Sequence, residues 1–192
     1  MAHTPKAEDG RKLRSEESRR RIVEALFEIT RSGTMAPSAA QVAEKAGVGV
    51  RTVFRHFEEM DSLYSEMSEQ TAARILPVVR APYTASTWRG RLDELLERRF
   101  GIYEEILPIK MAGDIYRFRS SFLMQDYQYY LQVERETLYE VLPARIAKNR
   151  KLAETLLLLA SFQTWRQLRQ DQDLSAEETG DTVRAAIGRL TE

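Results

Sequence analysis

Apolar residues recur along most of this chain at the three- and four-residue spacing of amphipathic α-helices. Between residues 19 and 31 the apolar side consists of Ile22, Leu26 and Ile29. Similar stripes run from residue 92 toward 106, from about 120 to 142, from 151 to 170 and from 183 to 190. No segment shows convincing strand alternation, so the pattern predicts an all-α fold.

The segment from Ser38 to Phe57 has the pattern of two short helices joined by a tight turn. Ser38 and Gln41 have the spacing of a capping box that begins the first helix. Gly47 suits the left-handed conformation that ends a helix, so the chain can reverse directly after it. Val53 and Phe57 then repeat at i, i+4 and predict the buried side of a second helix. This order of elements is that of a helix-turn-helix, whose second helix enters the major groove of DNA.

The outward positions of the second helix have the chemistry of a DNA contact. Arg donates to guanine edges or phosphates, Thr and His donate to phosphates, and Val can pack on a thymine methyl group. A solvated polar helix face is the alternative, but cap, small-residue helix, glycine turn and basic helix follow in the correct order. The predicted DNA-binding residues are Ser38, Val50, Arg51, Thr52, Phe54, Arg55 and His56, with Arg14 and Arg19 of the basic N-terminal segment.

This segment resembles the N-terminal DNA-binding domain of the TetR family of bacterial transcriptional regulators. The resemblance covers roughly the first third of the chain, from the amphipathic helix at 19–31 to Asp61-Ser62-Leu63-Tyr64. It implies an N-terminal three-helix DNA-binding domain with a helix-turn-helix over residues 18–62. It also implies a C-terminal helical domain for effector binding and dimerisation over residues 63–192. The polar residues 1–17 are expected to form a flexible basic arm.

Four positions depart from the pattern of that family. Gly49 stands where a Ser or Thr cap is usual, and Phe54 stands where Tyr is common. Val50 and Met60 each replace a frequent Lys. All four changes remove a side-chain donor near the expected phosphates, which leaves a sensor module with a relic helix-turn-helix as an alternative function.

Composition narrows the function classes further. The 29 basic and 29 acidic residues balance, which argues against a protein that coats nucleic acid indiscriminately. Cysteine is absent and only two histidines occur, so we expect no disulfide, thiol chemistry, metal site or cofactor. Neither a glycine-rich phosphate loop nor a nucleophile-base pair is evident, so we predict that the protein is not an enzyme. The absence of a signal peptide and of a long apolar run predicts a cytoplasmic location with no membrane partner.

The second half predicts a homodimer. Residues 152–160 are apolar nearly all round the helix, which a monomer surface does not sustain, and the last helix has its own apolar stripe. A fully buried central helix in a monomer is the alternative. The predicted interface, a four-helix arrangement of two subunits, contains Leu156, Leu159, Val183, Ile187 and Leu190.

The same half is rich in aromatic and Met side chains that suit a pocket for a small apolar or aromatic effector, although each is also an ordinary core residue. The candidate pocket residues are Tyr103, Met111, Tyr116, Phe122, Tyr127, Tyr130, Phe162, Gln163 and Trp165. Together these features predict a dimeric repressor that binds a palindromic operator in double-stranded DNA and is released by a small-molecule effector. A dimer that binds DNA or a protein partner without any effector is the alternative.

Overall fold

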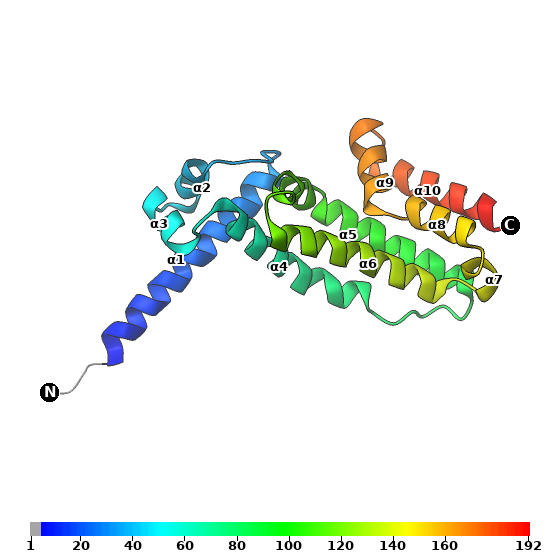
Figure 1. The fold of residues 1–192 in the computed structure, drawn as a ribbon, viewed down its shortest axis with the longest axis horizontal. Coiled ribbons are helices and arrows are strands. Elements are labelled where there is room, and N and C mark those ends of the chain that lie inside the picture. Colours follow the sequence, from blue (N-terminus) through cyan, green and yellow to red (C-terminus); the bar gives the residue numbers. More distant parts are fainter. Residues whose placement is uncertain (1–4) are drawn as a thin grey trace. The chain divides into compact units, whose positions relative to one another are not determined.

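The structure, a computed structural model, describes residues 5–192, except for the side chains of residues 5–9 and 11. All regular secondary structure in this range is helical (Figure 1). The predicted all-α class is therefore confirmed. The chain divides into two compact units, of which the first runs to Thr71 and includes Pro108–Met124, and the second consists of Ala72–Leu107 and Gln125–Glu192.

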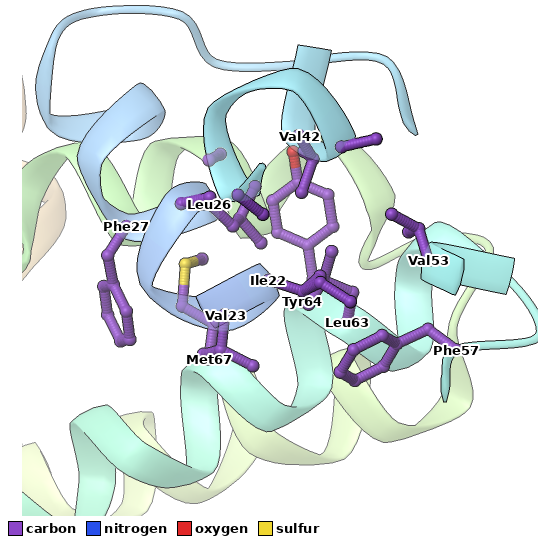
Figure 2. Close-up of a cluster of buried hydrophobic side chains, with 14 of the residues drawn as sticks. Ile22, Val23, Leu26, Phe27, Val42, Val53, Phe57, Leu63, Tyr64 and Met67 are labelled. Atoms are coloured by element: carbon purple, nitrogen blue, oxygen red, sulfur yellow. The ribbon is translucent and has the colours of Figure 1, made fainter. Parts of the chain in front are cut away.

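The first unit is built on α1 (Pro5–Arg31), α2 (Ala39–Ala46), α3 (Val50–His56) and the first part of α4 (Met60–Val79). Buried side chains from all four helices meet in one core, and Figure 2 shows the Tyr64 ring in its midst. Leu63, Tyr64 and Met67 of α4 belong to this core. The unit therefore extends past residue 62, where the sequence placed the domain boundary, and includes α4 as far as Thr71.

Residues 5–17, which the sequence predicts to be a flexible basic arm, are helical and form the first turns of α1. A proline is tolerated in the first turn of a helix, so Pro5 does not prevent this start. Local contacts support the helix: the Arg14 side chain donates to the Gly10 carbonyl at 2.9 Å, and Arg20 pairs with Glu17 and Glu24. The expected arm residues 1–4 lie outside the described range.

The second unit contains most of α5 (Trp88–Tyr116) and α6 (Ser121–Val141), followed by five further helical segments within the described residues. These are α7 (Ala144–Ala147), α8 (Arg150–Leu159), α9 (Phe162–Arg166), the π-helical segment η1 (Gln167–Asp171) and α10 (Ala176–Thr191). Helices α8 and α10 pack side by side (Figure 1). No helix within residues 5–192 combines the length and apolar character that a membrane crossing requires.

The single helix expected over residues 151–170 is broken after Leu159. Ser161 adopts an extended backbone conformation there, and its hydroxyl accepts a 3.3 Å hydrogen bond from the Thr164 amide. A Ser side chain that caps a new helix competes with continuation of the old one. The apolar periodicity on both sides of Ser161 concealed this break.

Candidate nucleic-acid interface

The helix-turn-helix begins with the predicted capping box. The Gln41 amide donates to the Ser38 hydroxyl at 3.3 Å, and the Ser38 amide donates to the Gln41 side chain at 2.9 Å. The Ser38 hydroxyl also contacts the Gln41 side-chain oxygen at 3.0 Å, so this group is already engaged in the cap. Ser38 is exposed at the start of α2, and its side chain acts first as a cap and not as a free phosphate donor.

The turn between the two helices depends on one glycine. Gly47 has φ 64° and ψ 38°, the left-handed region that residues with a Cβ adopt only under strain. The Val48 amide then donates to the Ala43 carbonyl at 3.0 Å, which closes the end of α2. Gly49 follows in an ordinary extended conformation and supplies no side-chain cap to α3.

Helix α3 separates its buried and exposed positions cleanly. Val53 and, just after the helix, Phe57 are 1% and 2% exposed and contribute to the core of the first unit (Figure 2). Val50, Arg51, Phe54 and Arg55 are exposed, whereas Thr52 and His56 are half-buried. Packing of Val53 and Phe57 into the core fixes which side of α3 faces solvent. That exposed side carries two arginines and two apolar side chains.

Arg19 does not lie free as the sequence suggested. Its guanidinium donates to the backbone carbonyl of His56 at 2.9 Å and lies over the Phe57 ring at 4.4 Å from the centroid. The same guanidinium forms an ion pair with Glu66 of α4. Arg19 therefore holds the end of α3 against α1 and α4, with its charge already paired, so we assign it a positioning role in place of the predicted phosphate contact.

His56 also differs from its predicted role as an outward donor. It is half-buried, and its Nε2 atom is shielded from solvent without a hydrogen-bond partner. Burial, followed by the charges of Arg55 and Arg19, lowers the pKa of His56 below its ordinary value. The ring is therefore neutral at pH 7 and adds no positive charge to the exposed side of α3.

The remaining predicted DNA-binding residues divide by exposure. Arg14 is exposed on α1, with its Nε atom bound to the Gly10 carbonyl. Within residues 5–192 no hydrogen bond or ion pair engages the side chain of Arg51 or Arg55. Glu58 and Glu59, directly after α3, are exposed and oppose a polyanion. Arg51 and Arg55 are thus the exposed basic groups that α3 itself offers to a polyanion.

The predicted pocket residues are divided between the two units. Tyr103, Phe162 and Trp165 of the second unit are buried and in ring contact, with centroids 5.5 Å apart for Tyr103 and Phe162 and 6.3 Å for Tyr103 and Trp165. Trp165 also stacks on Phe100 at 4.6 Å. These three side chains belong to the core of the second unit.

A buried hydrogen-bond network explains why polar groups occur in this core. The Tyr103 hydroxyl contacts the Glu134 carboxylate at 2.6 Å and the Ala160 carbonyl at 3.1 Å. Arg99 donates to the Ala160 carbonyl and to Thr137, both at 2.9 Å, and to the Glu134 carbonyl. Burial, followed by Glu134, raises the pKa of Tyr103 well above its ordinary value, so the hydroxyl stays protonated. These groups satisfy one another around the break between α8 and α9.

The other pocket candidates come from both units. Tyr116 stacks on Tyr64 in the first unit, with centroids 4.5 Å apart. Met111 and Phe122 also belong to the first unit, where Met111 is half-buried and Phe122 is exposed. Tyr127 and Tyr130 are half-buried on α6 in the second unit, and burial raises the pKa of Tyr130. Gln163 lines a groove of about 510 Å³ in the second unit.

That groove is open and partly apolar. Its lining consists of Leu131, Gln132, Glu134, Arg135, Glu154, Leu157, Leu158, Ser161 and Gln163, from α6, α8 and the start of α9. An ion pair between Arg135 and Glu154, with atoms 2.6 Å apart, contributes its charged part. The three leucines contribute the apolar part, a feature that the sequence reasoning missed because Leu131 was assigned to no stripe.

Three of the predicted interface residues are buried within the single chain. Leu156, Val183 and Ile187 are at most 3% exposed, because the apolar sides of α8 and α10 pack in the second unit. They cannot contact a second subunit, which corrects their assignment. Leu190 is 44% exposed and Leu159 is half-buried, so these two remain at the surface. Leu158, which was not predicted, is 62% exposed.

Comparison with solved structures finds close similarity of fold at low sequence identity. A transcriptional regulator from Rhodococcus sp. Rha1 matches with a TM-score of 0.69 and 19% identity, over 90% of this chain and 95% of that chain. A protein from Pseudomonas aeruginosa PAO1, named as a candidate transcriptional regulator, matches with a TM-score of 0.65 and 17% identity, over 90% and 89%. The chain shares their fold. No family model matches the sequence, and the search of curated proteins gave no match.

Proposed function

We propose that this protein is a sequence-specific DNA-binding transcriptional regulator of the TetR type, acting in the cytoplasm. One observation carries the proposal: a capped helix-turn-helix presents a second helix whose exposed side holds Arg51 and Arg55, free of hydrogen bonds and ion pairs within residues 5–192. Unpaired guanidinium groups on an exposed helix suit phosphates and guanine edges. The names of the two structural neighbours support the proposal, since both refer to transcriptional regulation.

The regulator is proposed to act as a homodimer on a palindromic operator. Helix α3 has seven residues, which span only about 10 Å at 1.5 Å per residue, so one copy reads only a few base pairs. Two copies related by a two-fold axis place their α3 helices in successive major grooves, about 34 Å apart. Leu159 and Leu190, the two predicted interface residues that remain at the surface, are the proposed centre of the interface.

Release of the operator by a small-molecule effector is the proposed mode of regulation. The groove beside Leu131, Leu157 and Leu158 has a volume in the range of small-molecule sites and combines apolar side chains with the polar Ser161 and Gln163. A ligand there shifts the protein toward a form with weaker DNA affinity only if it binds the two forms unequally. Titration of a candidate ligand against operator-bound protein tests this, and unchanged DNA affinity excludes that ligand.

A specific observation favours a second candidate function, an effector-independent DNA-binding dimer. Tyr103, Phe162 and Trp165, which the sequence predicts to line a ligand pocket, are buried and packed together. The Tyr103 hydroxyl and the Trp165 indole N–H are each hydrogen-bonded to a glutamate side chain. Close packing of these rings favours a core role over a ligand contact. This second function predicts that no member of a broad panel of small molecules changes the operator affinity. It also predicts that none of them raises the melting temperature of the protein.

Selection from a random duplex pool tests the proposal as a whole. The pool is incubated at moderate salt with wild type, with Arg51→Ala or with a control variant, Arg150→Ala. The duplexes that each protein retains are then sequenced. Arg150 is exposed at the start of α8, away from the helix-turn-helix in sequence, and the control variant should behave as wild type. Enrichment of one palindrome by wild type and Arg150→Ala but not by Arg51→Ala supports the proposal. No enrichment from an intact dimer supports a relic helix-turn-helix instead.

A further inference from the structure

Val50 and Phe54 form a row of exposed apolar side chains on the outer side of α3. They are 42% and 50% exposed, and their i, i+4 spacing makes them neighbours on the helix surface. Val53 already provides the buried apolar contact of the same helix. The core therefore does not require this second apolar row.

A basic row runs beside the apolar one. Arg51 and Arg55 are also spaced i, i+4, and each follows its apolar neighbour by one residue, about 100° around the helix. The exposed side of α3 thus offers parallel apolar and cationic rows. Positive charge next to exposed apolar groups suits a polyanion that also presents apolar groups in its groove, and less well a wholly apolar protein partner.

The major groove of B-DNA presents such a combination. Guanine offers two acceptors there, which arginine contacts, and thymine offers its 5-methyl group, the apolar group that distinguishes it in this groove. An α-helix with side chains is about 10–12 Å across and fits a groove about 12 Å wide. Exposed Val and Phe side chains on a helix in this position meet the methyl groups directly.

We propose that Val50 and Phe54 read thymine methyl groups, so that each operator half-site contains two thymines contacted by this row. The inference rests on the proposed DNA-binding function and specifies what its helix recognises. Four residues of helix advance about 6 Å, and successive base pairs are about 3.4 Å apart. The two methyl groups therefore lie about two base-pair steps apart in the half-site.

Deoxyuridine substitution tests this directly, because it removes the methyl group and leaves base pairing intact. Each thymine of the selected operator is replaced in turn, and dissociation constants are measured for wild type, Val50→Ala and Phe54→Ala. For wild type we expect two positions in each half-site at which the substitution weakens binding about three- to fivefold, the effect of losing one buried methyl group. One of these losses should vanish in Val50→Ala and the other in Phe54→Ala.

Matched variants control for general effects of the substitutions. Val78→Ala and Phe118→Ala make the same changes at side chains that are 47% and 74% exposed, in α4 and after α5, and should keep the full sensitivity to deoxyuridine. Phe54→Tyr keeps the ring and should also retain it. Because Val50 and Phe54 lie outside the core, the alanine variants should keep the circular dichroism spectrum and melting temperature of wild type.

The outcomes separate the two proposals. Specific operator binding that no deoxyuridine substitution weakens overturns the methyl readout but leaves DNA binding in place, and it points to a protein partner for the apolar row. Sensitivity that persists unchanged in both alanine variants also overturns it, because another residue then reads the methyl groups. Failure to select any operator removes the DNA-binding proposal and the readout with it.

Discussion

The Arg19 guanidinium donates a 2.9 Å hydrogen bond to the backbone carbonyl of His56, which lies 37 residues later in the chain at the end of α3. With the contact to the Phe57 ring and the ion pair to Glu66, one side chain of α1 thereby joins three helices of the first unit. A short helix is unstable alone, so such contacts determine whether α3 is formed in the free protein.

Arg19→Ala should lower the free energy of unfolding by about 1 kcal/mol, because a charge-assisted hydrogen bond and an ion pair are lost from a partly exposed site. Amide hydrogen exchange should also speed up at the end of α3. Arg20→Ala is the matched control, since among the described side chains Arg20 pairs with Glu17 and Glu24 of its own helix, and little change is expected. Equal effects of the two substitutions in urea unfolding and exchange contradict the positioning role of Arg19.

Two glycines two residues apart should respond differently to alanine. Gly47→Ala forces a Cβ into a backbone conformation with φ 64° and should cost about 1 kcal/mol of unfolding free energy. Gly49→Ala should cost less, since its backbone is extended and no atom lies within 4 Å of the added Cβ. Alanine is a poorer N-cap than glycine, but it also lowers the conformational entropy of the unfolded chain, which offsets that loss. Chemical denaturation of both variants measures the difference. Similar losses count against a left-handed Gly47.

The stability of the protein should depend on the ionisation of His56. The pKa of His56 is lowered in the folded protein from its ordinary value of 6.5, so the unfolded chain takes up a proton at the higher pH. The free energy of unfolding should therefore decrease as the pH falls through 6.5 toward the lowered folded pKa. His56→Gln should flatten this part of the profile. Denaturation curves from pH 8 to 5 provide the measurement, and an unchanged slope in the variant refutes the assignment.

Removal of the Tyr103 hydroxyl should expose the dependence of the second unit on its buried network. In Tyr103→Phe the Glu134 carboxylate loses a 2.6 Å contact inside the core, which should cost about 1–2 kcal/mol. Tyr139→Phe makes the same change at a half-buried hydroxyl 3.3 Å from Glu154 and should stay within about 0.5 kcal/mol of wild type. Urea unfolding compares the two. If Tyr103→Phe lowers the free energy of unfolding by no more than Tyr139→Phe does, the buried network contributes little to stability.

Local sequence signals predicted the helix-turn-helix in detail. The capping box at Ser38, the left-handed Gly47 and the buried Val53 and Phe57 all depend on residues within a few positions of one another. The role of Arg19 depends on groups 37 and more residues away, which no local pattern reveals. A basic residue at an exposed helix position looks the same in sequence whether it meets a phosphate or Glu66.

The second unit shows the same limit more strongly. Apolar periodicity correctly indicated helices but not which apolar side would face the core, so Leu156 and Ile187 were assigned to an interface although they are buried. The abundance of aromatic side chains suggests Tyr103 and Trp165 as pocket residues. Their hydrogen-bond partners, Glu134 and Glu104, are 31 and 61 residues away in the sequence, so no local pattern reveals them. Tertiary contacts decide these roles, and a single sequence contains no direct record of them.

The clean division of α3 also bears on how such a protein diverges. Val50, Arg51, Phe54 and Arg55 are exposed and contribute nothing to the core that Val53 and Phe57 maintain. Substitutions at exposed positions of this kind usually change stability by less than about 0.5 kcal/mol. Four codons can therefore vary almost independently of folding, so a new recognition preference is accessible by single mutations through intermediates that all remain folded.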